Sequence, residues 1–196
     1  MIAISYNPLA FGLMIVGVGA LLFGSCLHQY HKKKLSFGGE KTYGLMFIII
    51  GIITSLFAFI MYFTEPIPKQ YIEVYGVGYF MFSILMIVSG TILYKRLDKR
   101  PASYLALVSG VILLWTARNI YSYSMSKSPL GTTAIFAFAG LGSMGSYFFG
   151  SRKLKDIPGI LITLTVLAFV LCGLLALYSG FSAQFGHLGS LLNASS

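Results

Sequence analysis

Six runs of about 20 mostly apolar residues occupy nearly the whole chain, and short charged clusters separate them. A helix needs about 20 apolar residues to cross the hydrocarbon core of a bilayer. A helix also satisfies its backbone hydrogen bonds within the segment, as the bilayer interior requires. We therefore predict an all-α polytopic membrane helix bundle, one transmembrane domain over residues 1–196. The predicted spans are residues 8–27, 43–63, 76–94, 102–121, 131–150 and 158–177.

The composition agrees with a bilayer as the main solvent. Hydrophobic residues make up 57% of the chain, and only 14 Lys and Arg and five Asp and Glu are present, which leaves no soluble domain. The basic residues adjoin the apolar runs, where positive charge is an orientation signal. We therefore expect the lipid bilayer, and not nucleic acid, to be the partner of these charges.

Loop charge predicts the orientation. The first, third and fifth loops carry a surplus of Lys and Arg, whereas the second is acidic and the fourth has one lysine. The positive-inside rule then predicts a cell-membrane protein with both termini extracellular. The fifth run is rich in Gly and Ala, so its hydropathy is lower than that of its neighbours, and a five-span protein is the alternative. Without that span the charge alternation would be lost.

Tyrosines occur near both ends of the predicted spans, as expected of amphipathic rings at headgroup depth. We assign them to aromatic belts, without a functional role. The outer belt comprises Tyr62, Tyr71, Tyr75, Tyr121, Tyr123 and Tyr178, and the inner belt comprises Tyr30, Tyr43, Tyr94, Tyr104 and Tyr147.

Small residues recur at helical spacing in the last three spans, where they permit close helix packing in lipid. Packing within the bundle is one interpretation, and a homo-oligomer interface is the other. Glycines in the first span point to more than one face, which predicts that other helices surround it. The stripes are Ala102, Ala106 and Gly110, then Gly142, Ser146 and Gly150, then Ala168, Cys172, Ala176 and Gly180.

Arg118 lies inside the fourth predicted span, where an unpaired charge is costly. Glu65 and Glu73 bracket the predicted turn between spans two and three, at the same height. We predict an ion pair of Arg118 with Glu65 or Glu73, with Asn119 adding hydrogen bonds. This cluster is either a structural clamp or a ligand or ion site. The alternative is that Arg118 snorkels to the membrane surface.

The fourth span also carries a polar face. Ser109, Thr116, Asn119 and Tyr123 follow steps of seven, three and four residues, which places them on one side of a helix. That face is a candidate for a hydrated path. The alternative is that the Ser and Thr hydroxyls bond back to their own helix.

Residues for catalysis or metal binding are sparse. His28 and His31 flank the inner end of span one, while His187 follows span six, and Cys26 and Cys172 lie alone in apolar runs. These spacings match no metal site, and the sequence contains no hydrolase or P-loop motif. We therefore expect no enzyme activity, metal or cofactor. Asn193 begins a glycosylation sequon in the predicted outer tail.

Three short segments resemble an archaeal membrane-protein family known as domain of unknown function nine-eight-one. The resemblance implies a multispan bundle from an archaeon and no established activity. The matching segments are Asn7-Pro8-Leu9-Ala10, Thr64-Glu65-Pro66-Ile67-Pro68 with Tyr71 and Tyr75-Gly76, and Met125-Ser126-Lys127-Ser128-Pro129.

The functional prediction is a small channel or transporter for ions or small solutes. The candidate residues of its ligand or ion pathway are Arg118, Glu65, Glu73, Asn119, Thr116 and Ser109. Six helices of this length enclose little interior, so we expect a homo-oligomer. The alternative function is a non-catalytic subunit or assembly factor of a larger membrane complex.

Overall fold

The structure is a computed structural model that describes residues 8–64, 69–126, 128–151 and 157–194. Within these ranges every regular element is a helix. The helices are α1 (Pro8–His31), α2 (Phe37–Thr64), α3 (Lys69–Lys95), α4 (Arg100–Tyr123), α5 (Pro129–Ser151) and α6 (Gly159–Ala194). All six are long and apolar enough to cross a membrane. The chain is therefore a multi-pass helical membrane protein, and the fifth run is one of its spans.

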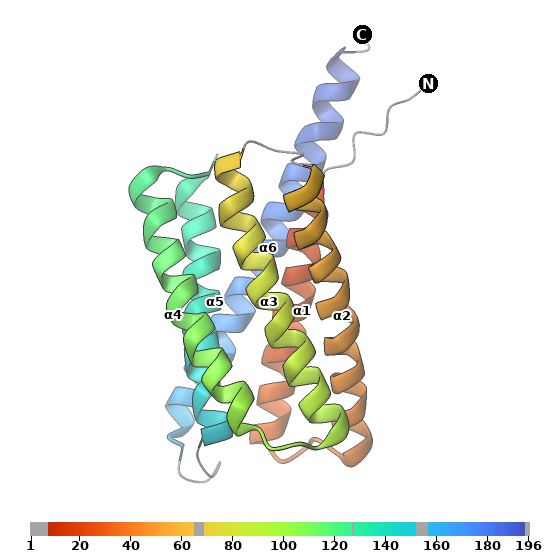
Figure 1. Ribbon diagram of the computed structural model, residues 1–196, viewed down its shortest axis with the longest axis vertical. Coiled ribbons are helices and arrows are strands. Elements are labelled where there is room, and N and C mark those ends of the chain that lie inside the picture. Colours follow the sequence, from red (N-terminus) through yellow and green to blue (C-terminus); the bar gives the residue numbers. More distant parts are fainter. Residues whose placement is uncertain (1–7, 65–68, 127, 152–156, 195–196) are drawn as a thin grey trace.

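All six helices extend beyond their predicted spans at one or both ends, and α3 and α6 extend the most. Helix α3 begins at Lys69, so Glu73 lies in its first turns and not in a loop. Helix α6 has 36 residues and is roughly 54 Å long at about 1.5 Å per residue. That length exceeds a hydrocarbon core of roughly 30 Å, and α6 projects past the other helices in Figure 1.

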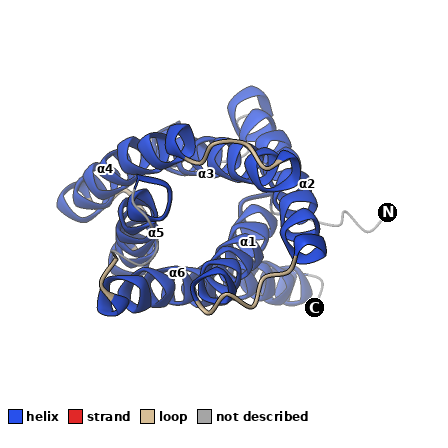
Figure 2. Ribbon diagram, turned by 90° about the horizontal axis from the view of Figure 1, so that it is seen from below, coloured by secondary structure: helices blue, strands red, loops and turns tan. Residues whose placement is uncertain are grey.

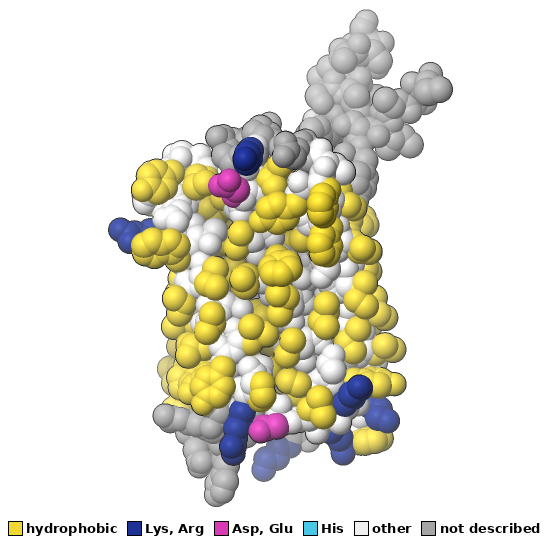
Figure 3. Space-filling view, in the orientation of Figure 1, with side chains coloured by type: hydrophobic (Ala, Val, Ile, Leu, Met, Phe, Trp, Pro, Cys, Tyr) yellow, Lys and Arg dark blue, Asp and Glu magenta, His cyan; other side chains and the backbone are white. Residues whose placement is uncertain are grey.

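The helices form a ring in chain order, and α6 closes it by packing against α1 (Figure 2). We call the end with the α1–α2, α3–α4 and α5–α6 connections the basic end, and the end where α1 begins and α6 finishes the terminal end (Figure 1). Lys and Arg gather at the basic end, while hydrophobic side chains cover the middle of the visible face (Figure 3). This pattern is typical of a protein surrounded by lipid.

The ring consists of three tightly packed helix pairs, α2 with α3, α4 with α5 and α1 with α6. Each pair has two glycines facing each other. A Cβ on Gly90 would lie 2.6 Å from the Gly44 carbonyl oxygen, and one on Gly110 would lie 2.8 Å from that of Gly140. In the third pair, a Cβ on Gly173 would lie 2.9 Å from the carbonyl oxygen of Gly17. Close backbone approach of this kind is the main means of helix association in lipid.

The glycines of α1 confirm that other helices surround it. Gly12 faces Tyr79 and Gly19 faces Phe82, both on α3, while Gly24 faces Phe169 on α6. Several residues of the small-residue stripes also pack inside the bundle. A Cβ on Gly180 would lie 2.7 Å from the Ala10 carbonyl oxygen. These stripes therefore serve packing within one chain.

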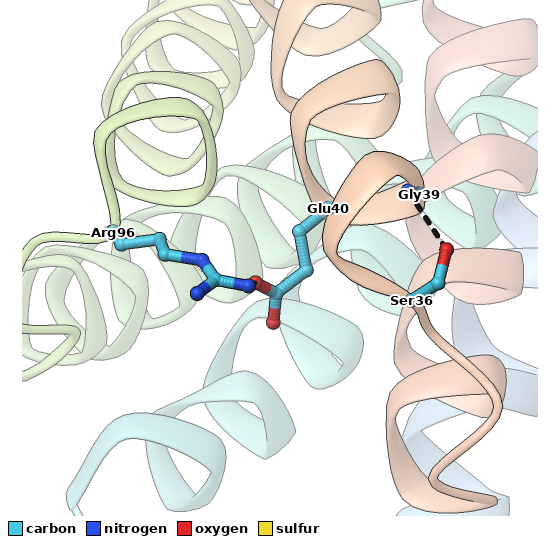
Figure 4. A network of polar contacts seen from close by, with 4 residues as sticks. All are labelled: Ser36, Gly39, Glu40 and Arg96. Carbon is cyan, nitrogen blue, oxygen red and sulfur yellow. Dashed lines mark hydrogen bonds and ion pairs between the residues drawn. The ribbon is translucent and has the colours of Figure 1, made fainter.

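An ion pair fastens α3 to α2 at the basic end. The Arg96 guanidinium lies 3.1 Å from the Glu40 carboxylate, in the first turn of α2 (Figure 4). The same guanidinium stacks 4.1 Å from the centre of the Phe37 ring. Ser36 accepts a hydrogen bond from the Gly39 N–H at 3.2 Å, as a helix N-cap residue does. These contacts fix the start of α2 beside the end of α3.

Candidate functional site

The predicted ion pair between Arg118 and Glu73 is not formed. Both side chains are exposed, and among the described residues the structure has an ion pair only between Arg96 and Glu40. The Arg118 guanidinium instead lies 5.4 Å from the centre of the exposed Trp115 ring, because its face of α4 points away from the bundle. Glu65 lies outside the described residues.

The residues of the polar face of α4 lie in three different environments. Ser109 is buried and its hydroxyl lies 3.9 Å from Met81 Sδ. Thr116 donates a hydrogen bond to the Ile112 carbonyl oxygen at 2.9 Å, the alternative considered from the sequence. Asn119 and Tyr123 line a surface pocket at the terminal end of α4. These residues do not together line a path through the ring.

An apolar cavity of about 150 Å³ lies inside the ring and is the candidate functional site. Its lining extends along α1 from Leu13 to Tyr30, roughly 26 Å at about 1.5 Å per residue, so the space is long and narrow. Most of its wall is aliphatic or aromatic. Apolar residues from all six helices form it, among them Leu13, Phe47, Phe82, Leu113, Phe136 and Phe169.

Buried side chains close the cavity at the terminal end. The Tyr75 hydroxyl lies 3.3 Å from Ser126 Oγ and 3.1 Å from Thr132 Oγ1, and these two oxygens are 2.7 Å apart. Tyr79 donates a hydrogen bond to the Leu9 carbonyl oxygen at 2.8 Å. Both phenols line the cavity, and protein groups already satisfy their polar atoms. The assignment of Tyr75 to the aromatic belt was therefore wrong, since its ring is buried.

The basic end of the cavity is more polar. Lys99, the N-cap residue of α4, and Tyr30, in the last turn of α1, both line it and are partly exposed. The Lys99 ammonium lies 3.9 Å from the centre of the Tyr30 ring. Ser103 donates a hydrogen bond to the Lys99 carbonyl oxygen at 3.0 Å. Lys99 is the one charged residue in the described lining.

Serine hydroxyls also lie towards this end of the wall, on α3, α4 and α5. They belong to Ser89, Ser103, Ser143 and Ser146. Ser146 bonds back to the Gly142 carbonyl oxygen at 2.9 Å. Ser143 is 4% exposed, and its hydroxyl has no hydrogen-bond partner among the residues that the structure describes. Burying a hydroxyl without a hydrogen-bond partner costs free energy. A polar ligand atom that bonds to Ser143 would remove this cost.

Sequence patterns did not reveal these residues. Lys99 resembles the other basic residues of its loop, and Tyr30 resembles a belt tyrosine. The four-residue spacing of Tyr75 and Tyr79 does put both on one helix face, and this spacing was the available signal. Periodicity does not say whether such a face meets lipid or a cavity.

Comparisons with known proteins identify the family but not a function. The search of curated proteins returned no match, and neither did the search of solved structures. A family model described as "Protein of unknown function (DUF981)" matches residues 1–190. Two of the segments that resemble this family meet in the structure, since Tyr75 contacts Ser126. The chain therefore belongs to the DUF981 family.

Proposed function

We propose that this protein is a transporter that holds a molecule with a hydrocarbon chain in the cavity of its helix ring. The observation that carries the proposal is the apolar wall, which runs along most of the length of α1. Apolar cavities exclude water and take up apolar ligands of matching shape. A long, narrow space suits an extended chain better than a compact solute.

Ion conduction has less support. Ion pathways use rings of carbonyl oxygens or charged side chains to replace the hydration shell, and apolar constrictions block conduction by dewetting. The terminal half of the cavity has apolar side chains and phenols whose hydrogen bonds are satisfied. The sequence predicts transport of ions or small solutes, and of these two classes a solute, here an apolar one, fits this cavity better than an ion.

The proposal also covers the orientation of the protein in the membrane, its lack of enzyme activity and its assembly. The basic end faces the cytoplasm of a cell, because Lys and Arg favour that side. The protein is not an enzyme, and it acts in the cell membrane as a homo-oligomer or with membrane partners. Lys99 then lies at the cytoplasmic surface.

Binding of a neutral chain tests the proposal. Native mass spectrometry of the full chain, released from detergent micelles, should detect 1-dodecanol bound to the protein. Ala106 is a small residue of the cavity wall, so Ala106→Leu fills part of the space. We expect this variant to weaken dodecanol binding at least tenfold.

The control is Val108→Leu, because Val108 is on the same helix and 56% exposed. It should bind dodecanol like the wild type. Ala139→Leu is a second variant of the wall, for use if Ala106→Leu does not fold. Selective ion flux in liposomes, without dodecanol binding, would contradict the proposal.

A non-catalytic subunit of a larger complex is the second candidate. The exposed Arg118 favours it, since a charge within the α4 span would be satisfied by an acidic partner helix. Failure to bind dodecanol, together with a partner that Arg118→Leu releases, would support this role.

A further inference from the structure

The ammonium group of Lys99 has no anionic partner in the described part of the chain. It contacts the face of the Tyr30 ring at 3.9 Å, a weak cation–π contact. The neighbouring Arg96 differs, because Glu40 neutralises it at 3.1 Å. Charge-assisted hydrogen bonds to carboxylate or phosphate oxygens are stronger than a cation–π contact. Within the described part of the chain, the Lys99 ammonium is therefore available to an anion.

The position of Lys99 gives that anion a route to the membrane surface. Lys99 precedes the first turn of α4 and is partly exposed, yet it also lines the cavity. Further Lys and Arg surround this end of the bundle (Figure 3). Such basic groups attract anionic head groups at a membrane surface.

The polarity of the cavity changes along its length. The buried hydroxyl of Ser143 lies on the basic side and lacks a partner in the described structure. At the opposite end, Tyr75, Ser126 and Thr132 bond to one another. A polar head group would therefore find the Lys99 ammonium at the basic end, and hydroxyls that already bond to one another at the terminal end.

We infer that the ligand is an anionic amphiphile, whose carboxylate or phosphate binds the Lys99 ammonium while its hydrocarbon chain extends along the cavity towards Tyr75. This inference rests on the proposed function, because it names the ligand class of the same cavity. The head group displaces the Tyr30 ring from Lys99 as it binds.

Three ligands with the same chain length test the inference by native mass spectrometry of the full chain at pH 8. Dodecanoate and dodecyl phosphate carry negative charge, whereas 1-dodecanol is neutral. We expect both anions to bind the wild type at least tenfold more tightly than dodecanol. The ratio of the affinities for dodecanoate and dodecyl phosphate shows whether the site prefers a carboxylate or a phosphate head group.

Lys99→Gln should bring the three affinities to within about threefold of one another, because it removes the charge and keeps a polar side chain. The matched control is Lys95→Gln, since Lys95 is exposed at the same end and does not line the cavity. It should retain the preference for anions.

Failure of the anionic-ligand inference and failure of the proposed function give different results. If dodecanol binds the wild type as tightly as dodecanoate, or if Lys99→Gln keeps the preference for anions, the anionic head group is wrong while a chain-binding cavity stands. If none of the three ligands binds the wild type, the proposed function fails as well.

Discussion

The Tyr75 hydroxyl on α3 lies 3.1 Å from the Thr132 hydroxyl on α5, across the terminal end of the ring. Ser126, just before α5, completes the cluster, and all three side chains are buried. Helices α3 and α5 belong to different tightly packed pairs, so this cluster joins two of the three pairs. It also forms the floor of the cavity, since Tyr75 is part of the lining.

Tyr75→Phe should lower the free energy of unfolding by about 1 kcal/mol, the usual contribution of one such hydrogen bond. The ring remains, so packing is preserved, and Ser126 and Thr132 keep their mutual bond. Thermal unfolding in detergent would measure the change. Tyr121→Phe is the control, because Tyr121 is 64% exposed, and it should be neutral. Equal stability of both variants would show that the cluster does not join the helix pairs.

Gly44→Ala should destabilise the α2–α3 pair by about 1–3 kcal/mol, as overpacking does. A Cβ at this position would lie 2.7 Å from the Tyr94 backbone nitrogen and 2.8 Å from the Gly90 carbonyl oxygen. Backbone atoms of a packed helix cannot move aside as a flexible side chain can. Denaturation in mixed micelles would measure the loss.

Gly38→Ala is the matched control in the same helix. No atom lies within 4 Å of a Cβ there, and alanine favours helix over glycine by up to about 1 kcal/mol. Stability should therefore stay the same or rise. If Gly44→Ala were as well tolerated as Gly38→Ala, close glycine contact would not hold this pair together.

Arg118→Leu should leave the unfolding free energy within about 0.5 kcal/mol of the wild type or raise it, because Arg118 is exposed and has no ion pair in the described structure. Arg96→Leu should lower it by up to about 1 kcal/mol, since it breaks the pair with Glu40 and the contact with Phe37. Both are measured by thermal unfolding at low salt. A marked loss of unfolding free energy in Arg118→Leu alone would instead support the structural clamp considered from the sequence.

Much of the fold follows from local properties of the sequence. The six spans and the burial of α1 were predicted, because apolar length and glycine placement are properties of one segment. The far end of α6 was missed. Its helix continues beyond the predicted end of the span at residue 177 up to Ala194, and hydropathy marks the width of the bilayer but not the end of a helix.

The candidate site depended on contacts between distant segments. The sequence placed Arg118 and Glu73 at one height, but height within a membrane does not determine which way a helix face points. The rotation of α4 is set by its packing, in which Gly110 meets Gly140, and this packing turns Arg118 outward and Ala106 inward.

By itself, the sequence determined that this chain is a bundle of six membrane helices with its basic loops at one end, since hydrophobicity and charge are properties of each segment. Only the tertiary structure decided that the helices close into a ring around an apolar cavity, with Lys99 at one end and Tyr75 at the other. The reason is physical: in lipid, an apolar residue is equally compatible with facing the membrane or an interior space, and only the packing of all six helices distinguishes the two.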